Sequence, residues 1–399
     1  MRVLLAFDKF KEALTASDAC RVVVRALAGK GMDVVERPLT DGGEGFCTLL
    51  TEAAGGELDW QKTEGPLGEW HSAPVGWVQW NRLPAAVWQV LPRQALKDEA
   101  GGRLAVIGMA EAAGLEQVAK GFRDPWRTTT LGVGRQLRQA IQADAKAIFI
   151  GLGGSATCDL GLGVLHGVGF RFLDAKGKAQ LPLPCNWSGI VTIVPPQASF
   201  RNALPAIFLA CDVDNPLLGP RGAGPVFGPQ KGLRQTELSH WEALAAKMAD
   251  LLEQACGASA STRDLAGAGA AGGFAYGLTV GLAAKMVPGF DLVASWLDLE
   301  TAVASADCVV TGEGRWDAGS LSGKGPYAVA VMADRLCKPV GVFAGSVDKA
   351  AAEKVQKALT QVSVHAISPV DLSLEEALRT THRHLPESVI DWLLRLNRV

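Results

Sequence analysis

The sequence predicts an α/β fold, and three observations lead to this prediction. Short apolar runs, typical of buried strands, alternate with stretches that have helical periodicity. Polar or glycine-rich clusters directly follow several of these runs, as they do where parallel strands end at a ligand-binding edge. The chain has 399 residues, which is enough for two or three domains.

The N-terminal part begins with two strand–helix pairs, predicted at residues 2–7, 16–28, 33–38 and 46–53. Thr15 is placed to cap the first helix, because its hydroxyl can accept a hydrogen bond from an amide of the first turn. From residue 75 to residue 91 the pattern changes to period-two alternation with tryptophans. This change predicts antiparallel strands and the start of a different sheet near residue 70.

The remaining strands are expected to be short and buried, at residues 104–107, 147–150, 206–210, 308–311 and 340–343. Thr128 is predicted to cap a helix that runs to about residue 143. Residues 373–396 predict two amphipathic helices that are broken near Pro386, because a proline inside a helix removes a hydrogen bond.

Charge and composition argue against several classes of protein. The chain has 39 basic and 41 acidic residues and no tail of one sign, so we expect no nucleic-acid partner. Its eight cysteines form neither a CxxC nor a zinc-site spacing, and the first residues lack a signal-peptide pattern. These features predict free thiols and a cytoplasmic location. Residues 265–284 carry no charge but include six glycines, which predicts a buried loop and helix and no membrane partner.

Six clusters of glycine and polar residues follow predicted strands. They lie at residues 8–11, 41–45, 151–157, 212–215, 312–317 and 345–346. Because the carboxyl ends of parallel strands share one edge of a sheet, we expect these clusters to line a common polar cleft.

The stretch GLGGSAT is the most specific of these clusters. Glycines let backbone amides approach a phosphate, hydroxyls add donors, and a helix is expected to begin directly afterwards, so the stretch predicts a phosphate-binding loop. Its predicted contacts are Gly151, Gly153, Gly154, Ser155, Ala156 and Thr157. The stretch also fits G-x-G-x-x-A, with Asp174 near the spacing of a ribose-binding carboxylate. A nicotinamide-dependent oxidoreductase is therefore an alternative.

The other clusters carry the groups that phosphoryl transfer requires: oxygen ligands for Mg²⁺, cations for the phosphate, and a base for the attacking hydroxyl. Candidate bases and metal ligands are Asp41, Glu44, Asp212, Asp214, Glu313 and Asp317. Candidate cations are Lys11, Arg127 and Arg315.

The motifs, taken in order, resemble those of the bacterial glycerate kinases that phosphorylate glycerate with ATP. The matching strings include DKFKEALTA, TDGGEG, TEGPLG, MAEAAGL, DPWRTTTLGVG, GLGGSATCD, CDVDNPLLGP and TGEGR. The resemblance extends from the first strand to about residue 346. The chain departs from the family pattern at Cys158, where Asn is expected, at Leu160, where glycine is expected, and at Lys9, where Ser is common.

The resemblance implies two α/β domains with the active site between them. Residues 1–70 and 290–399 would form a discontinuous Rossmann-like domain, and residues 71–289 an inserted α/β domain with a mixed sheet. The implied reaction transfers the γ-phosphoryl group of ATP to a hydroxyl of D-glycerate, with the 2-hydroxyl favoured and Mg²⁺ as the metal. A related small hydroxy acid is an alternative acceptor. The oligomeric state is open, with a homodimer among the alternatives.

The resemblance also distributes roles among the candidate residues. The expected catalytic residues are Asp8, Lys11, Asp41, Asp214, Arg315 and Asp317. Substrate contacts are expected from Lys11, Arg127, Asp212, Asn215, Glu313 and Arg315. The expected magnesium ligands are Asp41, Asp212 and Asp214.

Overall fold

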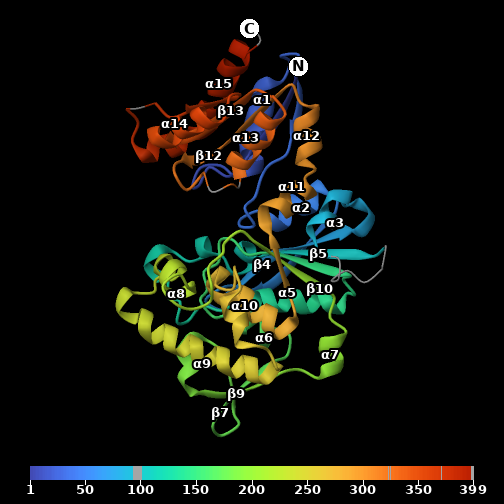
Figure 1. Ribbon diagram of the computed structural model, residues 1–399, viewed down its shortest axis with the longest axis vertical. Helices are drawn as coiled ribbons and strands as arrows, with labels where there is room; N and C mark the ends of the chain where they lie inside the picture. Colours follow the sequence, from blue (N-terminus) through green and yellow to red (C-terminus); the bar gives the residue numbers. More distant parts are fainter. Residues whose placement is uncertain (93–100, 322, 324, 370, 397–399) are drawn as a thin grey trace. The chain divides into compact units, whose positions relative to one another are not determined.

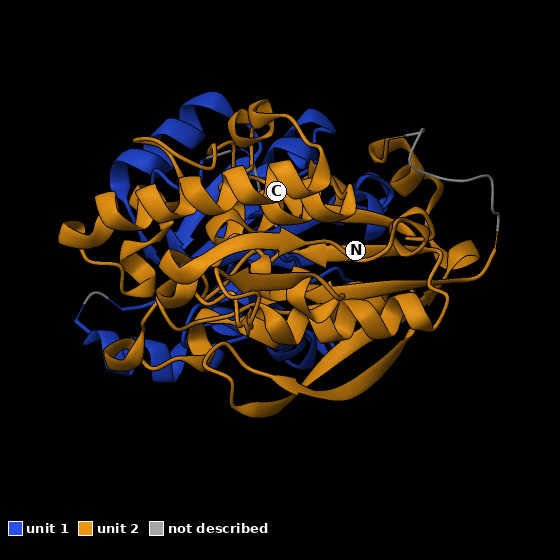
Figure 2. Ribbon diagram, turned by 90° about the horizontal axis from the view of Figure 1, so that it is seen from below, with its two compact units in different colours: residues 1–41, 293–399 blue, residues 42–292 orange. Residues whose placement is uncertain are grey.

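The computed structural model describes residues 1–92, 101–321, 323, 325–369 and 371–396 (Figure 1). The chain forms two compact units, coloured separately in Figure 2. Unit 1 comprises Met1–Asp41 and Val293–Val399, and unit 2 comprises Gly42–Leu292. Each unit has its own sheet and helices, so the predicted α/β class is confirmed.

Unit 1 contains a five-stranded sheet in the order β14-β13-β12-β1-β2, and all its pairings are parallel. The strands are β1 (Arg2–Phe7), β2 (Asp33–Glu36), β12 (Cys308–Trp316), β13 (Val340–Val347) and β14 (Val362–Ala366). The helices are α1 (Ala16–Leu27), α12 (Leu299–Ser305), α13 (Gly325–Arg335), α14 (Lys349–Ala358) and α15 (Leu374–Leu396).

The centre of this sheet is β1, which is buried from Val3 to Phe7. Its odd-numbered residues share a core with α1 and α15, while α12 and α13 also contact the strand. Strands buried on both faces are continuously apolar, as the first strand was predicted to be. The predicted cap is confirmed, because the Thr15 hydroxyl accepts a hydrogen bond of 3.1 Å from the Asp18 amide.

The prediction of two helices near the C-terminus is wrong, because residues 374–396 form the single helix α15 with Pro386 inside it. An interior proline costs a helix about 3 kcal/mol. Leu385, Val389 and Leu393 are fully buried in the core that α15 shares with α1. Burial of one such side chain contributes about 1.5–3 kcal/mol, so tertiary packing offsets the cost of the proline.

Unit 2 contains a six-stranded mixed sheet in the order β11-β10-β6-β5-β4-β3 and a smaller sheet in the order β8-β7-β9. The pairings among β5, β6, β10 and β11 are parallel, whereas β4 is antiparallel to both β3 and β5. The strands are β3 (Glu57–Glu64), β4 (Trp70–Gln79), β5 (Arg103–Gly108), β6 (Ala147–Gly151), β7 (Arg171–Asp174), β8 (Ala179–Gln180), β9 (Ile190–Val194), β10 (Ala206–Cys211) and β11 (Lys285–Pro288).

The helices of unit 2 are mostly short. They are α2 (Phe46–Ala53), α3 (Ala85–Val90), α4 (Met109–Ala113), α5 (Leu131–Gln142), α6 (Leu162–Gly167), α7 (Ala198–Asn202), α8 (Ala223–Phe227), α9 (Leu238–Cys256), α10 (Ala270–Leu282) and α11 (Gly289–Trp296), whose last residues belong to unit 1. Within the described residues, none of the helices combines the length and apolar character needed to cross a bilayer.

The alternating pattern at residues 75–91 predicted the structure only in part. Residues up to Gln79 form the antiparallel strand β4, as expected, but α3 follows instead of a further strand. The rings of Trp80 and Trp88 stack with their centroids 4.1 Å apart. These tryptophans therefore pair with each other outside any strand, and their spacing imitates strand alternation.

Residues 42–70 lie in unit 2, although the resemblance implied a first segment that continues to residue 70. The reason is local packing: α2 contacts β4 and β5, and β3 pairs with β4 from Glu57 to Glu64. The predicted domain limits themselves stay a prediction.

The glycine-rich residues 265–284 form a buried turn and α10, as expected. Ala271, Gly272 and Gly273 adopt left-handed backbone angles at the start of this helix. A Cβ at Gly277 would lie 1.9 Å from the Leu160 carbonyl oxygen. Glycine therefore allows the helix to pack directly on neighbouring backbone.

Candidate active site

In unit 2, the predicted phosphate-binding loop, residues 151–157, leaves the carboxyl end of β6, between β5 and β10. It packs against the backbone of residues 42–45, since the Gly153 amide donates to the Gly42 carbonyl at 2.8 Å. A Cβ at Gly153 would lie 2.6 Å from the Gly43 Cα, and only glycine fits there without a shift. Gly153 and Gly154 reach the surface, whereas Ser155, Ala156 and Thr157 are buried.

The far side of this loop is anchored to residues 113–115. The Leu115 amide donates to the Gly154 carbonyl at 2.7 Å, and the Ala156 amide donates to the Ala113 carbonyl at 2.9 Å. The Thr128 hydroxyl donates to the Ala156 carbonyl at 3.4 Å. Thr128 therefore fixes the loop and does not cap a helix as predicted; α5 begins later, at Leu131.

The expectation that a helix begins directly after the loop is wrong. The next helix, α6, starts at Leu162, and its first amides are already bound by Asp159, which accepts from Gly161 at 3.1 Å and from Gly163 at 3.2 Å. The same carboxylate accepts from the Thr130 amide and hydroxyl, each at 2.8 Å. The positive end of α6 is thus occupied by the protein's own anion, and phosphate binding would rest on the loop itself.

Lys231 is a loop contact that the sequence reasoning missed. Its Nζ donates to the Ser155 Oγ at 2.7 Å and to the Thr157 carbonyl at 2.8 Å. A lysine 76 residues along the chain gives no local signal.

Glu111 is a second missed residue. Its carboxylate accepts from the Cys47 amide at 3.2 Å and so caps α2, whose N-cap residue Gly45 has no side chain. Burial is the main cause that raises the Glu111 pKa to about 7, and the charge of Glu44 adds to the effect. The string MAEAAGL contains Glu111, but an acidic residue in a short helix is ordinarily a surface residue.

Unit 1 brings together four predicted or neighbouring residues near the end of β1: Asp8, Lys9, Asp41 and Glu313. The predicted strand at residues 308–311 is too short, because β12 continues to Trp316, so Glu313 lies within the strand and not after it. The Lys9 amide donates to Asp8 Oδ1 at 2.7 Å, and the Lys9 ammonium lies 4.0 Å from Asp41 Oδ1. Burial raises the Asp8 pKa to about 7, helped by the charges of Asp41 and Glu313. Burial also raises the Glu313 pKa, and Glu313 Oε1 has no hydrogen-bond partner among the described residues.

Arg315 and Asp317 lie further along the same segment of unit 1. Their side chains form an ion pair of 3.1 Å, and the Arg315 side chain is 75% exposed. Asp317 also accepts from the Gly319 amide at 2.8 Å. Lys11 is exposed near this strand end, where its amide lies 3.0 Å from the Cβ that Gly314 would carry.

Four predicted residues in unit 2 have other partners. Asp212 Oδ1 accepts from the Phe290 amide at 3.0 Å. Asp214 is exposed and binds the Arg221 guanidinium through both oxygens at 2.8 Å, which lowers the Asp214 pKa. Asn215 donates to the Arg221 carbonyl at 2.8 Å. Arg127 is exposed and lies 3.8 Å from the Asp124 carboxylate.

Of the predicted magnesium ligands, Asp41 lies in unit 1, whereas Asp212 and Asp214 lie in unit 2. Throughout the part of the chain that the structure describes, no three His, Cys, Asp or Glu side chains gather closely enough to hold a metal ion. Asp214 in particular is engaged by Arg221. Which residues hold Mg²⁺ therefore stays a prediction.

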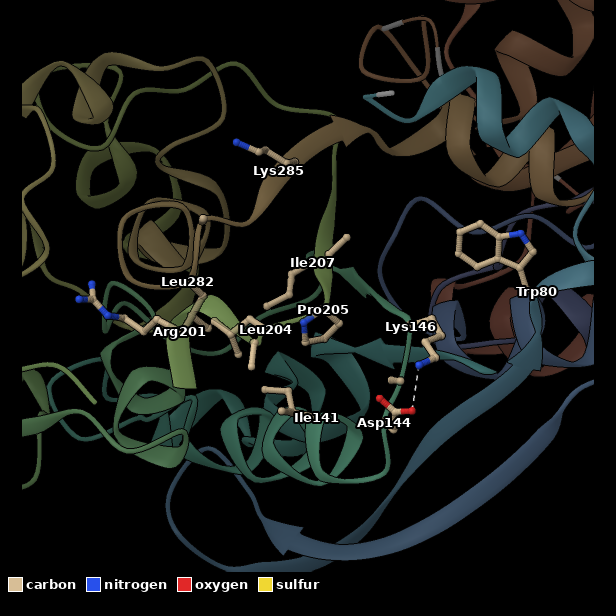
Figure 3. Close-up of a pocket in the computed structure, with 14 residues that line it drawn as sticks. Trp80, Ile141, Asp144, Lys146, Arg201, Leu204, Pro205, Ile207, Leu282 and Lys285 are labelled. Carbon is tan, nitrogen blue, oxygen red and sulfur yellow. Dashed lines mark hydrogen bonds and ion pairs between the residues drawn. The ribbon is translucent and has the colours of Figure 1, made fainter. Parts of the chain in front are cut away.

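A cavity of about 350 Å³ lies elsewhere in unit 2 (Figure 3). It is lined by residues that precede or begin β6, β10 and β11, among them Lys146, Ile207 and Lys285, and the Lys146 ammonium is paired with Asp144 at 2.9 Å. The cavity thus lies at the amino ends of the parallel strands. Ligands of open α/β sheets bind at the carboxyl ends, and none of the predicted site residues lines this cavity.

Backbone groups lie at the carboxyl end of the parallel strand β6, and ionisable carboxylates lie near that of the parallel strand β1. These are the two kinds of group that a kinase needs, to bind phosphate and to activate a hydroxyl. The comparisons with known proteins agree with this class. Residues 3–395 match the sequence pattern of the Glycerate kinase family, and the chain belongs to that family. The predicted family and the predicted enzyme class, a kinase, are therefore confirmed.

Proteins and a solved structure with glycerate kinase names are similar to this chain over most of its length. A protein of Bacillus subtilis named glycerate kinase is 35% identical over 98% of this chain and 96% of its own length. A protein of Escherichia coli named glycerate 2-kinase is 33% identical over 87% of this chain and 85% of its own. A crystal structure from Salmonella typhimurium assigned to glycerate kinase 2 is 33% identical, with a TM-score of 0.71 over 98% of this chain and 99% of that chain.

Proposed function

We propose that this chain transfers the γ-phosphoryl group of ATP to the 2-hydroxyl of D-glycerate, giving 2-phosphoglycerate and ADP. The observation that carries the proposal is its similarity, over 87% of the chain, to a protein named glycerate 2-kinase. The local geometry supports it, because both kinds of group that the reaction needs lie at carboxyl ends of parallel strands.

Asp8 is the proposed general base for the acceptor hydroxyl. A base works best when its pKa lies near the working pH, since it is then both ionised and still basic. The burial of Asp8 and the neighbouring carboxylates raise its pKa to about 7, which satisfies this condition. The exposed cations Lys11 and Arg315 are proposed to neutralise the glycerate carboxylate and the migrating phosphoryl group.

The loop of residues 151–157 is proposed to bind the phosphates of ATP. Gly153 and Gly154 reach the surface. The Gly153 amide already donates to the Gly42 carbonyl, so the proposed approach of a phosphate oxygen is to the backbone of Gly154 and the residues after it. Ser155 lies directly behind them, held by Lys231 at 2.7 Å. Mg²⁺ accompanies ATP in kinases, where it neutralises phosphate charge. Its ligands in this chain, a homodimer and a cytoplasmic location stay predictions.

The nicotinamide alternative finds little support in the geometry. A Rossmann fold places its ribose-binding carboxylate on the strand next to the one that carries the glycine loop. Here the neighbours of β6 are β5 and β10, whereas Asp174 lies in β7 of the smaller sheet. The Asp174 carboxylate is also occupied, accepting from the Lys176 and Lys178 amides at 2.9 Å each.

A coupled assay of ADP release tests the proposal, with ATP, Mg²⁺ and D-glycerate as substrates and with L-glycerate and no acceptor as controls. We expect ADP release that depends on D-glycerate, and phosphorus NMR should show the coupling pattern of the 2-phosphate. A 3-phosphate product would correct the position of transfer. ADP release only with another hydroxy acid would replace the acceptor, and NAD(P)-dependent oxidation of glycerate without ADP release would favour the oxidoreductase.

A further inference from the structure

Lys231 places a positive charge directly beneath the proposed phosphate-binding loop. It ends a short 3-10 helix, Pro229–Lys231, and is only 2% exposed. Its ammonium contacts two loop residues, the Ser155 hydroxyl at 2.7 Å and the Thr157 carbonyl at 2.8 Å. The closing end of the loop is therefore held by a buried cation from a segment 74 residues away.

The direction of these hydrogen bonds follows from chemistry. A lysine ammonium has only donors, so Ser155 Oγ must accept from Lys231. The Ser155 proton is then left for another acceptor, and none appears among the described residues. A charged donor also polarises the hydroxyl that it binds, which makes that hydroxyl a stronger donor in turn. Ser155 is thereby prepared to donate to an anionic oxygen.

The buried Lys231 side chain lies near a buried carboxyl group, that of Asp159. Burial lowers the Lys231 pKa, and the charge of Asp159 acts in the opposite direction. Asp159 is fully buried and accepts hydrogen bonds from Thr130 and from the first amides of α6. Burial raises the Asp159 pKa, and the four hydrogen bonds that the carboxylate accepts act in the opposite direction.

The segment that carries Lys231 is held rigidly. Gly232 has a φ of 99°, and a Cβ there would lie 2.2 Å from the Arg123 carbonyl oxygen. The Arg123 guanidinium donates to the Gln230 carbonyl at 3.1 Å and to the Leu115 carbonyl at 3.4 Å. Because the Leu115 amide binds Gly154, Arg123 ties the lysine segment to the opposite side of the same loop.

We propose that Lys231 is a positioning residue for phosphate: it fixes the Ser155 hydroxyl as a donor and adds positive charge beneath the loop that receives the triphosphate. Because this role rests on the proposed function, it makes a claim about phosphate groups only. Adenosine has no phosphate, so its binding should not depend on Lys231, whereas ATP and inorganic tripolyphosphate should bind less tightly without it.

The test is isothermal titration of the full chain and its Lys231→Met variant with ATP, adenosine and tripolyphosphate. Methionine matches the length of the lysine side chain without its charge or donors. We expect the variant to raise the Kd of ATP and of tripolyphosphate at least ~10-fold, which corresponds to the loss of charge-assisted hydrogen bonds, and to leave adenosine within about twofold.

Lys247→Met is the matched control. Lys247 is also a lysine of unit 2 that donates to two carbonyls, those of Trp187 at 3.0 Å and Ser188 at 2.9 Å, and neither of these residues belongs to the loop. This variant should lose comparable hydrogen bonds and bind ATP like the wild type. Ser155→Ala should weaken ATP and tripolyphosphate binding in the same direction, and the double variant should be no worse than Lys231→Met alone.

Unchanged ATP binding in Lys231→Met, or an equal loss for adenosine, would overturn the proposal. If Lys231→Met does not fold, binding to Ser155→Ala tests the proposal: a loss of affinity specific to phosphate compounds supports the role of Lys231, and unchanged binding refutes it.

Measurements on the wild type distinguish a failure of this inference from a failure of the proposed function. Lys231-dependent tripolyphosphate binding without ATP-dependent glycerate phosphorylation would support the phosphate site and refute the glycerate 2-kinase, and a wild type that binds neither phosphate compound would refute both.

Discussion

The carboxylate cluster of unit 1 and the glycine loop of unit 2 both lie toward the carboxyl ends of parallel strands, but they present different chemical groups. In unit 1 the candidate functional groups are ionisable side chains near the carboxyl end of β1, chiefly Asp8, Asp41 and Glu313, which lies within the neighbouring strand β12. In unit 2 the end of β6 offers backbone atoms, while the charged groups, Lys231 and Asp159, are buried and already bound.

This difference teaches how each region can fail. A carboxylate can no longer act as a base once it takes up a proton, or once Asn replaces Asp. Either change has little effect on the surrounding structure. A backbone loop has no side chain to remove, so it fails when atoms are added where other backbone lies close. The first region should therefore be sensitive to pH and to isosteric substitution, and the second to added volume.

The largest effect is expected from Asp8→Asn. The asparagine oxygen can still accept from the Lys9 amide, which binds Asp8 Oδ1 at 2.7 Å, so the fold should persist. The base is lost, however, and general-base catalysis contributes about 10²–10⁴-fold, so we expect kcat to fall by that factor. Steady-state ADP release measures it, with Asp33→Asn as the control, since Asp33 is an exposed aspartate of the same unit paired with Arg2 at 3.4 Å. A variant with wild-type kcat would remove Asp8 from the reaction.

The same residue predicts the pH dependence of the wild type. The pKa of Asp8 is raised to about 7, and only its ionised form can accept a proton. The value of kcat/KM should therefore rise about tenfold per pH unit below 7 and level off above it. The residual activity of Asp8→Asn should lack this rise, and a profile that keeps it would assign the titration to another group.

A smaller effect on catalysis but a larger one on structure is expected from Gly153→Ala in unit 2. The new Cβ would lie 2.6 Å from the Gly43 Cα and 2.7 Å from the Gly43 nitrogen, so one of the two backbone segments must move. We expect at least ~10-fold weaker ATP binding and a loss of about 1–3 kcal/mol in unfolding free energy. Gly189→Ala is the control, because nothing lies within 4 Å of the Cβ it would add. Equal ATP affinity in both variants would show that the close contact at Gly153 does not shape the loop.

The contrast between the two regions also marks what the sequence could predict. Strands such as β1 and β6 were recognised because parallel strands are apolar throughout, and the loop was recognised because glycine and serine follow such a strand. Asp8 was found because it follows β1 directly, and Glu313 because it follows the apolar part of β12. Features that depend on neighbouring residues in the sequence could therefore be predicted.

Hydrogen-bond partners that lie far apart in the sequence could not be predicted. Lys231 reaches the loop from 76 residues away, and Glu111 caps α2 from 64 residues away. Asp159 accepts hydrogen bonds at the start of α6, where the sequence had predicted that phosphate would bind. No periodicity reports such contacts, because they depend on which elements the fold brings together. The stacking of Trp80 on Trp88 misled the strand prediction for the same reason.

The smallest effect is expected from Glu111→Gln, which tests whether unit 2 also contains a titrating carboxylate that behaves like those of unit 1. Burial raises the Glu111 pKa to about 7, above the ordinary value of about 4.3 in an unfolded chain. The folded state therefore holds this proton more tightly, and the resulting stability is complete below about pH 4.3 and is lost as the pH rises through 7. Glutamine stays neutral and can still accept from the Cys47 amide, which binds the carboxylate at 3.2 Å.

Urea unfolding at pH 5 and pH 8 measures this effect. The unfolding free energy of Glu111→Gln relative to wild type should increase with pH, by up to about 1.4 kcal/mol per pH unit, whereas that of Glu57→Gln, at an exposed position of β3, should not increase. If the stability difference between Glu111→Gln and wild type is the same at both pH values, Glu111 stays ionised in the fold, and the comparison sharpens: titrating carboxylates then belong to unit 1, and the loop of unit 2 is held by groups whose charges do not change near neutral pH.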